Sequence, residues 1–245
     1  MILGDVWDWF TSGANWRGTD GVPNRLAEHL VLSAESLAIA LAIALPVALT
    51  LGHLGRGGFL AINISNVGRA VPSLALLVFV SQAFATIGST PAIVALVALA
   101  VPPVVTNTYV GVREVDPDVK EAARGMGLSG RQVLTRVELP LALPLVLAGI
   151  RTAAVQVVAT ATLAALVAAG GLGRLIVDGF GTLQYDKVYA GAILVALLAL
   201  TVEVSLGALQ RRLAPADRRR RVRAVPGGAA GVDPARTGSA RITSS

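Results

Sequence analysis

Apolar segments long enough to cross a bilayer constrain this chain more than any other feature. A membrane-spanning helix needs about 20 mainly apolar residues. Four runs reach that length, at residues 26–51, 91–112, 141–168 and 188–209, and a shorter one lies at 72–87. Hydrophobic residues make up 54% of the chain and charged residues only 15%, a composition typical of integral membrane proteins. The sequence therefore predicts an all-α integral membrane protein with about five transmembrane helices.

The N-terminal segment, residues 1–25, is expected to lie at the outer face of the membrane. It lacks the basic start, short apolar core and cleavage site of a signal peptide. It carries Trp7, Trp9 and Trp16 among acidic residues, and tryptophan just before a span suits the membrane interface. We expect a short interfacial helix here, with a disordered tail as the alternative.

The remaining segments complete the predicted organisation. Residues 26–210 form the transmembrane domain, which includes a charged cytoplasmic loop at 113–140. We expect an interfacial helix at 59–70 and a short helix around 175–180. Residues 211–245 are basic and rich in Pro, Gly and Ser, which predicts a disordered cytoplasmic tail.

The distribution of basic residues predicts the orientation, because cytoplasmic loops carry an excess of Lys and Arg. If the N-terminus lies outside, the cytoplasmic side carries Arg56, the basic residues of the 113–140 loop and the arginines after residue 210. The outside keeps only Arg17, Arg25, Arg174 and Lys187. The N-terminus is therefore expected outside and the C-terminus in the cytoplasm.

Composition and motifs also exclude several functions. The chain has no cysteine, so disulfides and thiolate chemistry are excluded. No nucleotide-binding, hydrolase or metalloprotease motif occurs. Neither His29 nor His53 belongs to a metal-binding pattern. The tail arginines have no aromatic neighbours, which favours anionic lipid over nucleic acid. We expect no metal, no cofactor and no enzymatic activity.

The loop at 113–140 has the local chemistry of two short helices. Asp116 can cap the first helix, with Pro117 at its first position. Gly125 and Gly127 break that helix. Ser129, followed by Gln132, forms a capping-box pattern that starts a second helix, which we expect to stop at Leu139-Pro140.

The same loop carries a spaced motif: Glu121-Ala122-Ala123, three residues, Gly127, nine residues, Val137, one residue and Leu139-Pro140. It resembles the EAA loop of bacterial ABC importer permeases, in which isoleucine is usual at the Val137 position. The resemblance implies a permease fold of the methionine/molybdate-permease type. It also implies that Glu121, Ala122, Ala123, Gly127, Leu139 and Pro140 couple the chain to a separate ATPase subunit.

Other segments, among them Val71-Pro72-Ser73, Ala148-Gly149-Ile150-Arg151 and Gly170-Gly171-Leu172-Gly173, resemble the osmoprotectant branch of these permeases. That resemblance covers about residues 26–210. It implies a bacterial cell-membrane pathway for quaternary-ammonium solutes such as glycine betaine, carnitine or choline. The implied partners are an ATPase, a second permease subunit, identical or paralogous, and a substrate-binding protein, expected to be separate because this chain has no room for one.

Two alternatives stay open. The first is an ABC permease for another small solute, such as an amino acid. The second is an ATP-independent channel or carrier, which would leave the motif at 121–140 unexplained.

Intramembrane polar residues are the candidates to line a translocation path, because such residues usually face a cavity or another helix. We select Ser73, Thr106, Asn107, Tyr109, Gln156 and Thr160. Hydrogen bonding between helices is the alternative for the Ser and Thr residues. Asn107 stands out because it follows Pro102-Pro103, which we expect to break the third span.

A few further residues complete the predictions. Gly170, Gly171 and Gly173 are candidates for an outer gate, where glycine permits close packing. Arg151 is expected to anchor a span at the interface, and Glu203 to pair with Arg151 or Arg211. Only 4% of the chain is aromatic, too little to promise a cation–π cage for a quaternary ammonium group.

Overall fold

The computed structural model describes residues 2–58, 63 and 70–213, and the regular structure in this described part is entirely helical. These helices belong to one compact unit, Met1–Ala214. The long helices are α2 (Val22–Leu54), α5 (Ser89–Arg113), α8 (Leu139–Thr160) and α10 (Tyr185–Leu213). The shorter helices are α1 (Ile2–Thr11), α4 (Ser73–Ala83), α6 (Pro117–Gly125), α7 (Gly130–Val133) and α9 (Gly173–Gly181), with short turns η1 (Gly13–Trp16), η2 (Leu134–Glu138) and η3 (Leu163–Val167).

Four helical segments of the described residues are long and apolar enough to cross a membrane: α2, α5, the continuous stretch Gly130–Thr160 and α10. The predicted short span at 72–87 is the 11-residue helix α4. At 1.5 Å per residue, α4 is about 16 Å long, roughly half the hydrocarbon core of a bilayer. The interfacial helix expected at 59–70 falls almost entirely outside the described residues.

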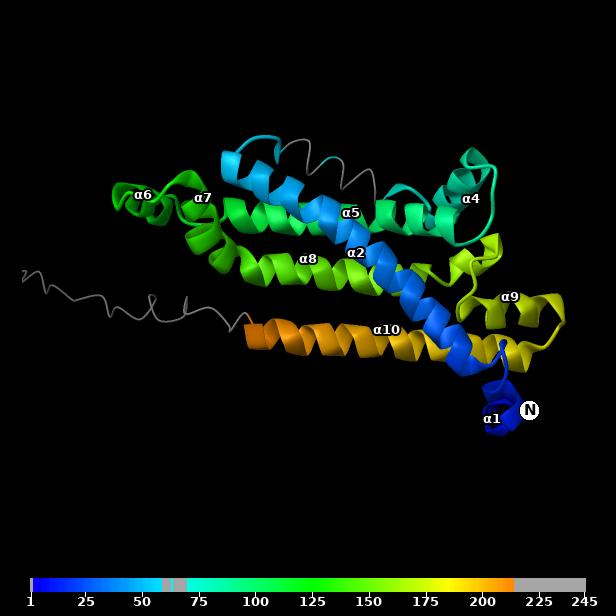
Figure 1. The fold of residues 1–245 in the computed structure, drawn as a ribbon. Helices are drawn as coiled ribbons and strands as arrows, with labels where there is room; N and C mark the ends of the chain where they lie inside the picture. The colour runs from blue at the N-terminus through cyan, green and yellow to red at the C-terminus, as the bar shows by residue number, and fades with distance from the viewer. Residues whose placement is uncertain (1, 59–62, 64–69, 214–245) are drawn as a thin grey trace, which may run out of the picture. The chain divides into compact units, whose positions relative to one another are not determined.

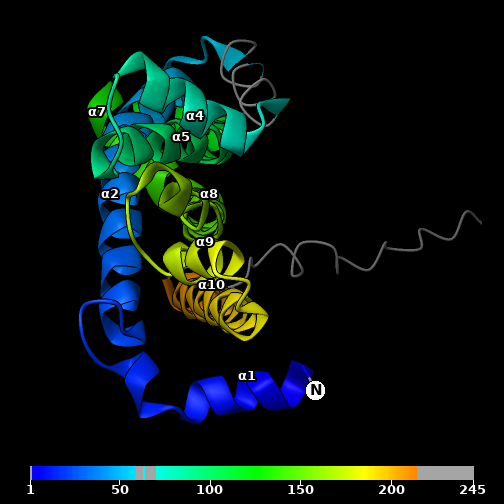
Figure 2. The ribbon, with the colours of Figure 1, turned by 90° about the vertical axis from the view of Figure 1, so that its right-hand side faces the viewer.

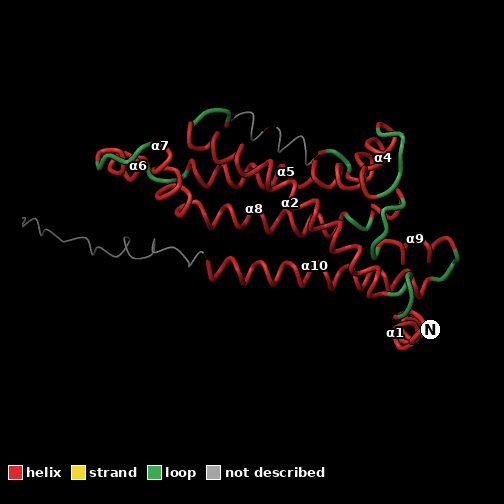
Figure 3. Tube along the Cα trace, viewed as in Figure 1, coloured by secondary structure: helices red, strands yellow, loops and turns green. Residues whose placement is uncertain are grey.

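The long helices pack side by side, with α5 against both α2 and α8, and α10 against α8 (Figures 1 and 3). The amide of Gln210, near the end of α10, donates to the carbonyl of Pro144, near the start of α8, at 3.0 Å. α8 and α10 are therefore antiparallel. Helices α6 and α7 lie at one end of the bundle, and α1, α4 and α9 lie at the other (Figure 1).

Small residues allow the central helices to approach closely. Ala40, Ala44 and Ala48 are fully or almost fully buried and recur every fourth residue along α2, in a core shared with Val104 and Tyr109 of α5. In the next repeat, a Cβ atom at Gly52 would lie 2.8 Å from Val112 Cβ. This pattern follows the membrane rule that small residues let backbones come together where the hydrophobic effect provides no driving force.

The predicted break at Pro102-Pro103 is wrong, because α5 runs without interruption from Ser89 to Arg113 with both prolines inside it. Both prolines are buried. Membrane helices tolerate such prolines when neighbouring elements and local adjustments satisfy the carbonyls that lose a donor. In contrast, the span predicted at 141–168 ends early: α8 stops at Thr160, and η3 follows.

The N-terminal segment forms a helix, as predicted, rather than a disordered tail. Trp9 is buried among residues that include Leu172 and Ala190, and Trp7 is 69% exposed. Helix α1 packs on α10 and runs across the end of the bundle (Figure 2). The short helix expected around 175–180 is also present, as α9.

We predict that Gly149→Ala destabilises the bundle. The added Cβ would lie 2.8 Å from Asn107 Cβ and 3.0 Å from the Pro103 carbonyl oxygen of α5. Overpacking of this kind costs about 1–3 kcal/mol, whereas alanine in place of glycine within a helix normally adds up to about 1 kcal/mol of stability. Thermal unfolding of the detergent-purified protein should show a lower midpoint. Gly181→Ala is the matched control, because its Cβ meets nothing within 4 Å; an unchanged midpoint for Gly149→Ala would contradict the packing.

Candidate functional site

The first part of the loop between α5 and α8, up to the start of α7, folds as its local chemistry predicts. The Asp116 carboxylate accepts a 2.9 Å hydrogen bond from the backbone N–H of Asp118, and Pro117 opens α6. Gly127 follows the end of α6 with φ of +86°, a conformation in which glycine carries no Cβ penalty. The backbone N–H of Ser129 donates to the Gln132 side chain at 2.8 Å and completes the start of α7.

The predicted coupling residues form a partly exposed surface. Glu121, Ala122 and Gly127 are exposed, and Met126, beside them, is 75% exposed. Ala123 is only 2% exposed, because it lies on the inner face of α6. The side of the loop that carries Glu121, Ala122 and Gly127 is therefore free to contact another molecule.

The helix expected to stop at Leu139-Pro140 does not stop there. Helix α7 continues through the π-helical turn η2 into α8, and Pro140 occupies the first turn of α8. Proline lacks an N–H and clashes with the carbonyl four residues earlier. A π turn contains one residue more than an α turn. Here it lies just before Pro140, where the backbone hydrogen bond of the missing proline N–H is lost, so the helix continues past Pro140. Leu139 is half-buried and Pro140 exposed.

A buried charged residue that the sequence analysis did not single out is Glu138, at the end of η2. Its side chain is 1% exposed, and its Oε2 lies 2.6 Å from Nδ1 of His53, in the last turn of α2. An ionised Glu138 can only accept here, so this pairing requires the proton on Nδ1 of His53. Lys120 Nζ lies 3.6 Å from Glu138 Oε1. His53, for which the sequence offered no role, is thus paired with a buried carboxylate.

A sequence signal for Glu138 did exist. Glu138 falls in the buried stripe of its helix, between Val133 and Ala142. A carboxylate in such a stripe is costly and requires a partner. The sequence could not show which cation supplies it.

The six predicted path residues are distributed over several interfaces. Asn107 donates from Nδ2 to the Pro103 carbonyl at 2.8 Å and packs against Gly149 of α8. Tyr109 is 8% exposed and lies in the core between α2 and α5. The other four are half-buried: Ser73 on α4, Thr106 on α5, and Gln156 and Thr160 on α8. Their role as a path lining stays a prediction.

The predicted gate glycines pack against the start of α2. Gly170 and Gly171 have φ of +83° and +79°. A Cβ on Gly170 would lie 2.7 Å from Glu28 Oε2, and one on Gly171 3.1 Å from His29 Nδ1. A Cβ on Gly173 would overlap the Thr162 carbonyl. Positive φ favours glycine at positions 170 and 171, and the Thr162 backbone leaves no space for a side chain at position 173.

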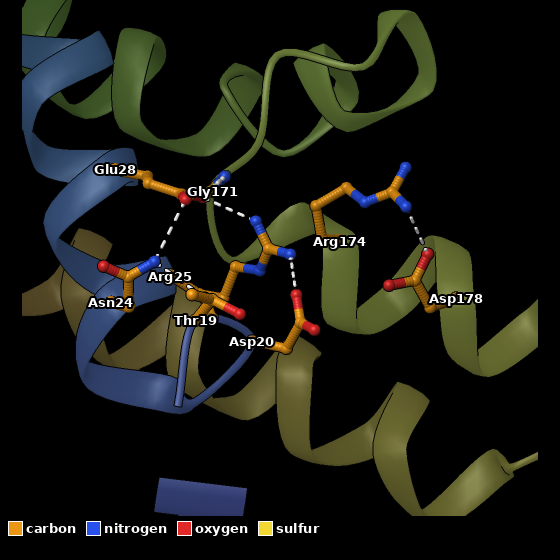
Figure 4. A network of polar contacts seen from close by, with 8 residues as sticks. All are labelled: Thr19, Asp20, Asn24, Arg25, Glu28, Gly171, Arg174 and Asp178. Atoms are coloured by element: carbon orange, nitrogen blue, oxygen red, sulfur yellow. Dashed lines mark hydrogen bonds and ion pairs between the residues drawn. The ribbon is translucent and has the colours of Figure 1, made fainter. Parts of the chain in front are cut away.

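A polar network ties this glycine loop to α2 (Figure 4). Glu28 Oε2 accepts from the backbone N–H of Gly171 at 2.9 Å and from Arg25 at 2.8 Å. The second nitrogen of Arg25 pairs with Asp20, and Asn24 donates to Glu28 Oε1 at 3.2 Å. The next residue, His29, is fully buried and donates from Nε2 to the Val158 carbonyl of α8 at 2.9 Å.

Glu203 pairs with Arg151 across α10 and α8, with 3.5 Å between Oε1 and Nε. This resolves the choice that the sequence left open between Arg151 and Arg211. The pair also changes the expected role of Arg151, because its guanidinium bonds to a neighbouring helix instead of serving only as an interfacial anchor.

Comparisons with known proteins agree with this arrangement. The family described as "Binding-protein-dependent transport system inner membrane component" matches residues 38–215. The chain is similar to the carnitine transport permease protein OpuCB of Listeria monocytogenes, with 40% identity over 77% of this chain and 86% of the relative. It is also similar to the choline transport system permease protein OpuBB of Bacillus subtilis, with 35% identity over 79% of this chain and 88% of the relative.

Among solved structures, an inward-facing MetNI methionine ABC transporter has a chain that superposes with a TM-score of 0.65 at 26% identity, over 76% of this chain and 93% of that chain. An amino acid ABC transporter solved with histidines gives a TM-score of 0.63 at 21% identity, which shows the fold alone. The predicted permease fold is confirmed. With most of its length matched by the family and by relatives of 35% and 40% identity, this chain belongs to the binding-protein-dependent inner-membrane transport components.

Proposed function

We propose that this chain forms the membrane pathway of an ABC importer for quaternary-ammonium osmoprotectants such as glycine betaine, carnitine or choline. The observation that carries the proposal is the exposed loop surface of Glu121, Ala122 and Gly127 at one end of a bundle of membrane-length helices. Relatives that match along most of their length are named as carnitine and choline permeases, which supports the substrate class.

ATP hydrolysis takes place on a separate ATPase subunit, which docks on this loop surface. When the ATPase subunits close on bound ATP, α6 and α7 move. The helices joined to them then tilt between inward- and outward-facing states. A second permease subunit completes the pathway, and a separate binding protein delivers the substrate. Gly170, Gly171 and Gly173 form the outer gate, at the end opposite the loop (Figure 1).

The alternatives receive less support. The methionine transporter and the amino acid transporter share the fold, but at 26% and 21% identity they are more distant than the osmoprotectant permeases. An ATP-independent carrier would have no use for the exposed loop surface at 121–127.

In this proposal residues 1–25 lie outside the cell and residues 211–245 in the cytoplasm. The start of α2 and the loop at 113–140 lie at opposite ends of the bundle (Figure 1). The excess of basic residues in the loop and after residue 210 supports a cytoplasmic position for that end.

The orientation can be tested with single cysteines, because the sequence has none. Ser89, at the start of α5, and Met126, in the loop, are both exposed. We expect Ser89→Cys to react with an impermeant thiol reagent in intact cells. Met126→Cys should react only after the membrane has been opened. Labelling of Met126→Cys in intact cells would reverse the orientation.

The docking surface can be tested with Gly127→Asp. Its Cβ meets nothing within 4 Å and its φ is +86°, so the carboxylate projects from the loop into the space proposed for the ATPase. We expect normal membrane insertion, loss of the co-purified ATPase and loss of substrate uptake. Gly18→Asp is the matched control, because Gly18 has φ of +80°, an open Cβ position and a place at the opposite end of the bundle. Uptake by Gly127→Asp at the wild-type rate would exclude the loop as the docking surface.

Substrate selection is expected to lie mainly on the binding protein. Cation–π recognition of a quaternary ammonium group needs aromatic rings around one point. Tyr109 is in the helix core, while Phe79 is 72% and Phe84 52% exposed, and the described residues offer one aromatic pair, Trp9 with Phe10. Titration of the purified permease with labelled glycine betaine should show no high-affinity binding. Micromolar binding without the receptor would place the specificity site in this chain.

A further inference from the structure

We infer that Glu138 is a positioning residue that links the loop at 113–140 to α2, so that the Glu138–His53 pair transmits loop movement to that helix. This inference rests on the proposed function, because it assigns a role in coupling. It concerns residues on the inner side of the loop, whereas the proposed docking surface lies on the outer side.

The first support is the energetic cost of Glu138. Its side chain is 1% exposed, and a buried carboxylate loses its hydration, so it must be compensated by a close partner. His53 Nδ1 supplies that partner at 2.6 Å. Removal of His53 would leave the buried carboxylate with only the 3.6 Å contact to Lys120. The pair is therefore a strong link between two segments 85 residues apart in the sequence.

The second support is that three elements meet at this carboxylate and a fourth lies beside its histidine partner. Glu138 lies on η2, His53 on α2 and Lys120 on α6. The neighbouring α7 leaves space for the His53 ring, since a Cβ on Gly130 would lie 3.4 Å from its Nε2. A shift of α6 and α7 therefore acts on the end of α2 through these contacts.

Lys120 lies within reach of two acceptors, so a second arrangement of this junction is close to the observed one. Its ammonium group donates to the Val112 carbonyl of α5 at 3.1 Å. It lies 3.6 Å from Glu138 Oε1, which has no hydrogen-bond partner. A small movement of α6 would transfer Lys120 from the carbonyl to the carboxylate. Coupling between distant sites requires an element with two such arrangements.

Helix α2 can carry the movement to the other end of the bundle. It is one helix from Val22 to Leu54, about 50 Å long at 1.5 Å per residue. Near its start, Glu28 holds the backbone N–H of Gly171 at 2.9 Å. The same helix therefore contacts the coupling loop at one end and the glycine loop at the other.

The experiment uses the permease assembled with its ATPase and binding protein in proteoliposomes, with the variants Glu138→Gln, His53→Gln and the double variant. Three quantities are measured: ATPase bound per permease, ATP hydrolysed, and glycine betaine taken up per ATP. We expect bound ATPase to stay at the wild-type amount. Uptake per ATP should fall about tenfold in each single variant, within the range typical of coupling free energies. The double variant should be no worse than either single variant, because the two changes break one link.

Glu114→Gln is the matched control, since Glu114 is an exposed carboxylate in the same loop, and its uptake per ATP should be unchanged. Wild-type uptake per ATP in both single variants, or additive losses in the double variant, would overturn the inference. If Glu138→Gln does not accumulate in the membrane, His53→Gln decides alone, because it leaves Lys120 beside Glu138. A wild-type permease that binds no ATPase would instead overturn the proposed function itself.

Discussion

The close approach of α5 to its two neighbours is the constraint on which the rest of the structure depends. In a bilayer, helices gain little from hydrophobic burial, so packing at short range must hold them together. The repeat of Ala40, Ala44 and Ala48 gives α2 a flat face against α5, and Gly149 gives α8 a similar one. This packing brings the end of α2 to the loop after α5, and it places His53 and Glu138 within hydrogen-bond distance.

Most of the helical architecture could be predicted from the sequence because it depends on local patterns. Apolar length predicted the long helices, and the N-caps at Asp116 and Ser129 predicted the starts of α6 and α7 within the loop. The contacts of the candidate site could not be predicted, because they join segments far apart in the chain. Glu28 reaches Gly171 over 143 residues, and His53 reaches Glu138 over 85. Local chemistry indicates that a buried charge needs a partner, but the partner follows from the packing.

The prolines show where local rules fail for a physical reason. The rules that end a helix at proline describe a helix in water, where an unsatisfied carbonyl can turn to solvent. Inside the bundle, Pro102 and Pro103 are buried, and α5 continues past them. At Pro140 the chain uses a π turn, and the extra residue of that turn aligns Glu138 with the buried stripe that continues at Ala142. The irregularity that lets the helix pass Pro140 therefore also sets the direction of the Glu138 side chain.

Polar contacts in α2 are concentrated near its two ends, whereas its middle packs through alanine. The alanine face lets α2 approach α5 closely along its middle. The ends are held by directional bonds: Glu28 to the Gly171 backbone and His53 to Glu138. A helix that is closely packed in the middle and bonded at both ends moves as a unit when one end is displaced. This distribution of contacts gives a physical basis for a helix that relates the loop at one end of the bundle to the glycine segment at the other.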